Sequence, residues 1–295
     1  MKSIFSYILN LILFLVVVSL IMFLKLVGFK VSSFIGKYIG LLVGRFHKSN
    51  KVAYSNLKMV FPYKSESEIK KIIRGMWINL GRNFAEFPLV SSVDSQFIKN
   101  NIDNNDLEKL QNFLKQHPKI ILISAHFGAW ELAPKVIEML NMPIYLVYRH
   151  LNVNLFERLV AFLRGKYVSG VIPKKVTGAR KLINILKENE QAVLCMLMDQ
   201  KMNNGVDARF FGRLAKTSSS AAELSKKFNI PIVMANIKRI GDSTKYQVNI
   251  DPFITTIPTN NEEVLRLTQQ INDMFEIWIK ESPEQWFWVH NRWPK

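Results

Sequence analysis

The hydrophobic pattern of the chain begins with an uninterrupted apolar segment, Ile4–Leu24. It carries no charge, and its only polar members are Ser6, Tyr7, Asn10 and Ser19. At about 1.5 Å of rise per residue, a helix of this length crosses the roughly 30 Å hydrocarbon core of a bilayer. A cleaved signal peptide would have a shorter apolar region and a small-residue cleavage site, whereas Lys25 and Lys30 follow here. The pattern therefore predicts a retained membrane-spanning helix.

A helical pattern continues from about residue 31 to about residue 89, with apolar residues recurring on one face. Ser65 and Glu68 have the spacing of a capping box, so another helix is expected to begin there. Basic and aromatic residues make this region a candidate for contact with the membrane surface. Close packing against a second helix is indicated by glycines at a four-residue spacing, namely Gly36, Gly40 and Gly44.

Beyond about residue 118, short apolar runs alternate with segments of helical spacing. The runs typical of buried strands are 119–124, 143–148, 171–173, 192–198, 230–237 and 246–250. The helical segments are 130–140, 155–164, 178–189, 218–228 and 262–280. This alternation predicts an α/β domain with a largely parallel central sheet flanked by helices. We expect three parts: a membrane anchor at 1–28, a helical membrane-proximal region at 29–117 and an α/β core at 118–295.

The charge of the chain is strongly positive. Lys and Arg number 40 against 23 Asp and Glu, a net charge of +17. This excess points to an anionic partner, and nucleic acid, anionic lipid and an acidic carrier protein all qualify. Only Lys2 precedes the apolar segment, whereas the residues that follow it include Lys25, Lys30, Lys37, Arg45, Lys48, Lys51 and Lys58. By the positive-inside rule, the bulk of the chain is expected on the cytoplasmic side of the membrane.

The chain has one cysteine, Cys195, inside the apolar run 192–198. We expect a buried strand residue rather than a nucleophile, because nothing near it in the sequence would lower its pKa. A single cysteine rules out a disulfide framework, which suits a reducing compartment. The five histidines show no metal-ligand spacing, and no metal or other cofactor is expected.

The candidate chemistry follows the strand predicted at 119–124, because ligand-handling residues of open α/β sheets lie beyond the carboxyl ends of strands. His126 lies there, Glu131 comes five residues later, and Gly128 would allow a sharp turn between them. A histidine oriented by a carboxylate can remove a proton from a hydroxyl. The spacing alone leaves open a structural histidine beside a surface glutamate.

The string His-Phe-Gly-Ala-Trp-Glu at 126–131 resembles the H-x4-D/E signature of the glycerolipid acyltransferase superfamily. It is most similar to the bacterial lipid A biosynthesis (lauroyl/myristoyl) acyltransferase family, in which Glu replaces the usual Asp. A lone H-x4-E would be weak support, but further segments follow in the family's order over nearly the whole chain. They are Asn56-Leu57, Phe61-Pro62, Tyr148-Arg149, Leu163-Arg164-Gly165, Val171-Ile172-Pro173-Lys174, Met198-Asp199-Gln200, Phe210-Phe211-Gly212 with Thr217, and 283–293.

The resemblance implies transfer of a fatty acyl chain from an acyl carrier protein thioester to a hydroxyacyl arm of a lipid A precursor. The enzyme would act at the inner membrane, in contact with its anionic lipids. His126 would be the general base and Glu131 would orient it, with no acyl-enzyme, since the chain has no G-x-S-x-G motif. Arg164 matches the family's essential arginine and would hold a phosphate or an oxyanion. Arg149 is a candidate phosphate ligand, and Asp199 would pair with an arginine or support the site structurally.

Two other functions are weighed against this one. A lysophospholipid or glycerol-phosphate acyltransferase of the same superfamily would carry a Glu-Gly-Thr-Arg string, which is missing here. A non-catalytic, membrane-tethered protein that binds anionic lipid or nucleic acid would suit the charge, but no RNA-binding or helix-turn-helix signature is found, so no nucleic-acid partner is expected. The tryptophans of 283–293 fit either a membrane interface or core packing, and His290 among them is not expected to be catalytic.

Overall fold

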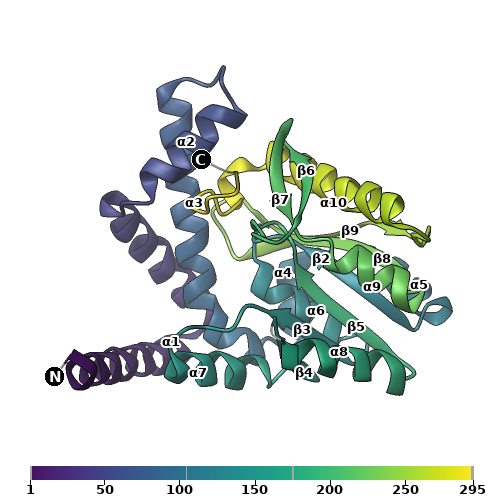
Figure 1. Ribbon diagram of the computed structural model, residues 1–295. Coiled ribbons are helices and arrows are strands. Elements are labelled where there is room, and N and C mark those ends of the chain that lie inside the picture. Colours follow the sequence, from purple (N-terminus) through teal and green to yellow (C-terminus); the bar gives the residue numbers. More distant parts are fainter. Residues whose placement is uncertain (1, 104, 175, 294–295) are drawn as a thin grey trace.

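The computed structural model describes residues 2–103, 105–174 and 176–293. N-terminal helices stand beside an α/β domain (Figure 1). The helices and 3-10 turns before the main sheet are α1 (Lys2–Phe46), α2 (Asn50–Val60), α3 (Glu66–Glu86), η1 (Phe87–Ser92), α4 (Ser95–Asn101) and α5 (Asp106–Gln116).

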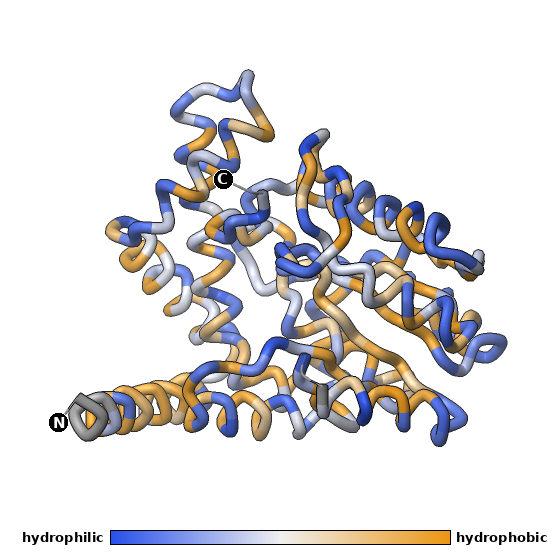
Figure 2. Tube along the Cα trace, viewed as in Figure 1, coloured by the Kyte–Doolittle hydropathy of each residue, from blue (hydrophilic) through white to orange (hydrophobic). Residues whose placement is uncertain are grey.

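Helix α1 bends at Gly28, whose φ of 80° and ψ of 171° are not helical. This backbone region is open almost only to glycine, because it has no Cβ. The arm before the bend is hydrophobic along most of its length (Figure 2), and its side chains from Tyr7 onward are largely exposed. By length and composition α1 can cross a membrane, as the apolar segment predicted.

The arm after the bend packs closely against α3. A Cβ on Gly36 would lie 2.4 Å from the carbonyl oxygen of Gly81, and one on Gly40 would lie 2.1 Å from that of Trp77. A Cβ on Gly44 would meet the Trp77 ring at 2.3 Å. The glycine spacing therefore marks a close helix crossing, as predicted.

A buried charge cluster fixes the same arm to the sheet. Arg239 donates to both carboxylate oxygens of Glu86 at 2.8 Å, and both side chains are almost fully buried. Ser33 of α1 donates to Glu86 at 2.5 Å and accepts from Arg82 at 2.7 Å. An ion pair taken out of water is tolerated only with such additional hydrogen bonds.

The central sheet has seven strands in the order β1-β9-β8-β2-β5-β3-β4. Their bounds are β1 (Ile102–Asp103), β2 (Lys119–Ser124), β3 (Ile144–Tyr148), β4 (Gly170–Pro173), β5 (Ala192–Leu197), β8 (Ile232–Ile240) and β9 (Lys245–Ile254). Five strands run parallel to one another, namely β2, β3, β4, β5 and β8. Strand β9 runs antiparallel to β8, and β1 pairs with β9 in parallel. The predicted α/β fold with a largely parallel sheet is confirmed.

Helices cover both faces of the sheet. Side chains alternate along a strand, so Ile121 and Ile123 of β2 join one core cluster and Ile120 and Leu122 join the other. The first cluster includes α3, α8 (Val176–Glu188), α9 (Ser220–Phe228) and α10 (Asn261–Glu281). The second includes α4, α5 and α6 (Ala133–Glu138). Helix α7 (Asn154–Arg164) connects β3 to β4 beside α1 (Figure 1), and η3 (Pro283–Gln285) precedes the C-terminal segment.

Some elements differ from the sequence-based expectation. The hairpin of β6 (Val206–Phe210) and β7 (Arg213–Thr217) forms a separate two-stranded sheet that was not predicted. The helix expected at 130–140 is a 3-10 turn, η2 (Trp130–Leu132), followed by the shorter α6. The division of the chain into three parts stays a prediction.

Candidate active site

Four polar side chains follow the carboxyl ends of four neighbouring strands. His126 comes after β2, Asp199 after β5, Arg149 after β3 and Lys174 after β4. These strands are adjacent and parallel, so their carboxyl ends meet at one edge of the sheet. The sequence-predicted residues His126, Asp199 and Arg149 therefore belong to one region.

The carboxylate that contacts His126 is that of Asp199. Nδ1 of His126 lies 2.8 Å from Oδ1 of Asp199, and the indole N–H of Trp286 donates to the other oxygen at 2.8 Å. Asp199 is only 1% exposed. Burial alone would raise the pKa of this carboxyl, but the charge of His126 and the hydrogen bonds from His126 and Trp286 lower it to about 2. Asp199 therefore stays ionised and orients the imidazole.

The loop that carries His126 is held on three sides. Gly128 N–H donates to Gln285 O at 3.0 Å, and the amides of Asn79 and Asn83 on α3 donate to Gly128 O at 3.0 and 2.8 Å. A Cβ on Gly128 would lie 1.9 Å from Ile237 O, and its φ is +59°, so only glycine fits this turn. The loop therefore offers a rigid mount for the histidine.

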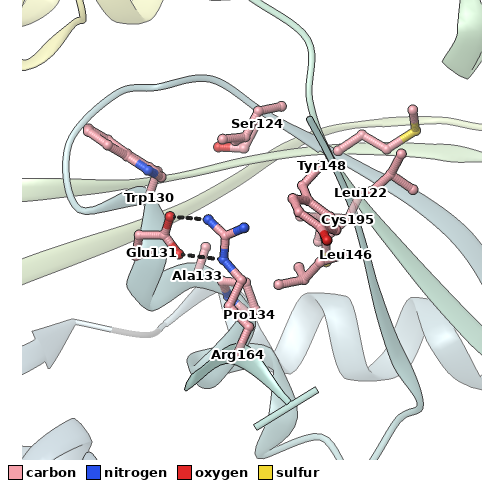
Figure 3. A pocket seen from close by; sticks show the side chains of 13 residues that line it. Leu122, Ser124, Trp130, Glu131, Ala133, Pro134, Leu146, Tyr148, Arg164 and Cys195 are labelled. Carbon is pink, nitrogen blue, oxygen red and sulfur yellow. Dashed lines mark hydrogen bonds and ion pairs between the residues drawn. The ribbon is translucent and has the colours of Figure 1, made fainter. Parts of the chain in front are cut away.

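Glu131 is paired with Arg164 of α7 rather than with His126. Arg164 Nη2 donates to Oε1 at 2.6 Å, and Nε donates to Oε2 at 3.3 Å (Figure 3). We expected Glu131 to contact and orient His126, and this contact is wrong: Asp199 occupies that position in the structure. The reason is geometric: Glu131 lies on η2, which turns it toward α7, whereas the parallel register of β2 and β5 brings Asp199 to the histidine.

A cavity of about 60 Å³ lies beside this ion pair (Figure 3). Its wall is mostly apolar and includes Leu122, Leu146 and Met196, while Glu131 and Arg164 form its charged side. Trp130 lines the cavity and also contacts the His126 ring edge-on, with centroids 5.6 Å apart. The indole of Trp130 thus joins the histidine region to the cavity.

Cys195 also lines this cavity from β5. Burial raises the pKa of its thiol to about 12, so it is not a thiolate at neutral pH. The prediction of a buried strand residue is confirmed. Ser124, at the end of β2, has a buried hydroxyl with no hydrogen-bond partner among the described residues.

His290 lies near the site, a placement that sequence reasoning missed. Its Nε2 accepts the backbone N–H of Lys201 at 3.0 Å. Burial lowers its pKa, and the charges of His126 and Arg149 act in the same direction while that of Asp199 opposes them. A position in the C-terminal tail carries no sequence signal for this placement, because it depends on how the tail folds back.

The C-terminal tail folds back over the strand ends. Its tryptophans Trp286, Trp288 and Trp293 are buried, and the indole N–H of Trp293 donates to Phe210 O at 2.9 Å. The sequence left open whether these tryptophans lie at a membrane interface or pack in the core, and their burial shows that they pack in the core.

Comparison with known proteins places the whole chain in one group. The family model described as bacterial lipid A biosynthesis acyltransferase matches residues 2–295. The lipid A biosynthesis palmitoleoyltransferase of Escherichia coli (strain K12) is 24% identical over 266 residues, covering 90% of this chain and 85% of that protein. The lauroyltransferase of the same organism is 24% identical over 260 residues, with 88% and 83% covered. The myristoyltransferase is 18% identical over 252 residues, with 85% and 77% covered.

Proposed function

The chain belongs to the bacterial lipid A biosynthesis acyltransferase family, and from that premise we propose its reaction. The donor is a fatty acyl thioester of acyl carrier protein, and the acceptor is the hydroxyl of a hydroxyacyl arm on a lipid A precursor. The reaction is a late acylation, forming an acyloxyacyl ester and releasing the carrier thiol. The observation that carries this proposal is the His126–Asp199 pair, which Trp130 connects to a mostly apolar cavity with an arginine on its wall.

His126 acts as the general base. Its Nδ1 faces Asp199, and its Nε2, which lies 3.5 Å from the side-chain nitrogen of Gln200, accepts the proton of the acceptor hydroxyl. The hydroxyl oxygen attacks the thioester carbonyl and forms a tetrahedral intermediate with a negative oxygen. When the C–S bond breaks, the thiolate takes the proton from the imidazolium. Asp199 favours the charged imidazole between these two steps.

Arg164 either stabilises the negative charge that develops on the carbonyl oxygen of the thioester or binds a phosphate of the acceptor. Glu131 holds it through Nε and Nη2, so Nη1 lies outside the pair. The rings of Phe87 and Tyr148 flank the guanidinium, each centroid 5.5 Å away. A guanidinium fixed in this way needs little reorganisation during the reaction. Arg149 and Lys174, at the ends of β3 and β4, offer further positive charge for acceptor phosphates.

The enzyme works at the cytoplasmic face of the inner membrane, as a single-pass protein. The apolar arm of α1 and the basic residues that follow it support this orientation. The net charge of +17 favours the acidic carrier protein and anionic lipids.

The test is acyl transfer by the purified, detergent-solubilised protein, with an acyl carrier thioester and a lipid A precursor, and with product identified by mass spectrometry. His126→Ala is expected to lower turnover by roughly 10² or more. The exposed His47 provides a matched control as His47→Ala. Near-normal transfer by His126→Ala would refute the mechanism, and transfer to a lysophospholipid instead of the lipid A precursor would refute the acceptor.

A further inference from the structure

Helix α7 is more apolar than its surroundings explain. Seven of its eleven residues are hydrophobic, yet only Glu157 and Leu163 are buried. Leu155, Leu159 and Phe162 fall on one helical face at spacings of four and three, and Phe162 is 62% exposed. A helix that is hydrophobic on most sides is normally covered by protein or by lipid.

Helix α7 runs alongside the apolar arm of α1, in the same direction (Figure 1). The ring of Phe156 meets that of Phe14, with centroids 6.0 Å apart. At the other end, the charges of Lys166 and Lys25 lie close enough to repel each other. The Phe14–Phe156 ring contact and the Lys25–Lys166 charge interaction are 11 residues apart on α1 and 10 apart along the α7 segment, which fits two helices running in the same direction.

We propose that α7 is a second membrane-contacting element, and that lipid acyl chains cover its face of Leu155, Leu159 and Phe162. Only the role given to the active site rests on the proposed function. The lipid contact itself does not, because lipid must surround the apolar arm of α1 wherever that arm crosses a bilayer. Because the Phe14–Phe156 contact places α7 beside that arm, the lipid around the arm also meets the face of α7. A protein partner would have to displace that lipid.

The charges at the ends of the two helices fit this placement. Lys25 and Lys166 are near enough for their charges to interact, and their ammonium groups can meet anionic headgroups together. Lys166 Nζ is 4.6 Å from the centroid of the Phe162 ring, so its stem lies along the apolar face.

The same helix reaches the candidate active site. Arg164 on α7 holds Glu131, and Glu157 accepts hydrogen bonds from the hydroxyl of Tyr148 and from Leu151 N–H at 2.8 Å. Tyr148 and Arg164 both line the cavity. Lipid contact on one side of α7 therefore sets the position of catalytic-site groups on the other, and a lipid acceptor reaches the cavity from within the bilayer surface.

The test is collision accessibility of a nitroxide on Phe162→Cys, in full-length protein reconstituted into vesicles of neutral and anionic phospholipid. Cys195 is buried and does not compete for the label. Leu265→Cys on α10, at a position that is 45% exposed, is the matched control. We expect the label at 162 to collide more with oxygen, which partitions into acyl chains, than with a water-soluble nickel chelate, and the reverse at 265. Equal behaviour at both positions would overturn the proposal.

An activity assay in two settings distinguishes failure of the lipid contact from failure of the proposed reaction. Phe162→Glu is expected to lower turnover about tenfold on acceptor embedded in vesicles and less than twofold on acceptor in detergent, whereas Leu265→Glu changes neither. Turnover in detergent also shows that the variant is folded. Equal loss in both settings would refute the lipid contact. The spin-label result needs no activity, so it stands even if the proposed reaction fails.

Discussion

At the scale of single residues, the charges around the strand ends form two separate pairs, His126 with Asp199 and Glu131 with Arg164. Asp199→Asn keeps the size of the side chain but removes the charge that favours a protonated imidazole. We expect turnover to fall by roughly 10² or more with little change in KM. Steady-state kinetics on the detergent-solubilised acceptor measures this.

A double variant of His126 and Asp199 tests whether the loss of turnover in Asp199→Asn acts through the histidine. If they act as a unit, His126→Ala combined with Asp199→Asn is little worse than His126→Ala alone. Additive losses would mean that Asp199 acts on something other than the histidine. Circular dichroism of each variant checks that the protein remains folded, since the buried carboxylate of Asp199 also accepts from Trp286.

His290 provides a pH-dependent prediction. Its pKa is lowered in the folded protein by burial, so the unfolded chain binds this proton more readily, with a pKa of about 6.5. The contribution of neutral His290 to stability is therefore present above about pH 6.5 and is lost as the pH falls through the lower folded value. We expect His290→Gln, whose amide oxygen can still accept from Lys201 N–H, to lose less stability between pH 7 and pH 5. Chemical denaturation across this range, with the exposed His47→Gln as control, checks it; identical slopes for wild type and His290→Gln would contradict it.

The positions of the site residues could be predicted from the sequence, but their partners could not. His126 and Asp199 each follow a short apolar run of the kind typical of a buried strand, which predicts both at strand ends, and the structure has β2 and β5 there. Which strand end faces which depends on the order β2-β5-β3, and this order arises from connections between distant segments. Glu131 is close to His126 in sequence, and proximity along the chain suggested a contact that η2 turns away.

At the scale of elements, the crossing of α1 and α3 depends on the absence of side chains. A Cβ on Gly81 would lie 2.1 Å from Gly36 O. Gly81→Ala should therefore force the helices apart and destabilise the protein by about 1–3 kcal/mol, despite the better helix propensity of alanine. Arg74→Ala, at an exposed position of the same helix, is the control. Thermal unfolding in detergent decides it, and an unchanged midpoint for Gly81→Ala would show that the crossing is looser than the glycine contacts imply.

The elements that could be predicted are those with a strong apolar period. The runs at β2 and β5 are buried on both faces and stand out, and the segment of α10 keeps its helical spacing over 21 residues. The β6–β7 hairpin escaped prediction because each strand has only five residues and carries charged side chains such as Asp207, Arg209 and Lys216. Several of its hydrogen bonds outside the hairpin go to the distant α10 and the C-terminal tail.

At the scale of the whole molecule, membrane attachment and folding should be separable. Leu24 is the first buried side chain of α1 among those described and packs against Ala85 and Leu89, whereas farther out along the arm Phe14 contacts Phe156 of α7. Deletion of residues 1–22 is expected to leave a folded protein that binds anionic vesicles only weakly, and that detaches as salt reduces the Debye length to about 8 Å at physiological strength. Vesicle flotation over a salt series measures this. Activity on detergent-solubilised acceptor should persist, and a folded but inactive truncation would show that the helix helps to build the site.

The bend at Gly28 sets the direction of the apolar arm of α1 relative to the rest of the helix. With 26 helical residues before the bend, at positions 2–27, the arm is roughly 39 Å long, so a change of about 10° at this one residue moves its far end by about 7 Å. Within the described part of the chain, nothing lies within 4 Å of a Cβ placed on Gly28, so the bend is held by the backbone there and by contacts of the arm itself, Leu24 with Ala85 and Phe14 with Phe156. A change of the backbone at Gly28 would therefore redirect the arm relative to the α/β domain only by breaking these contacts.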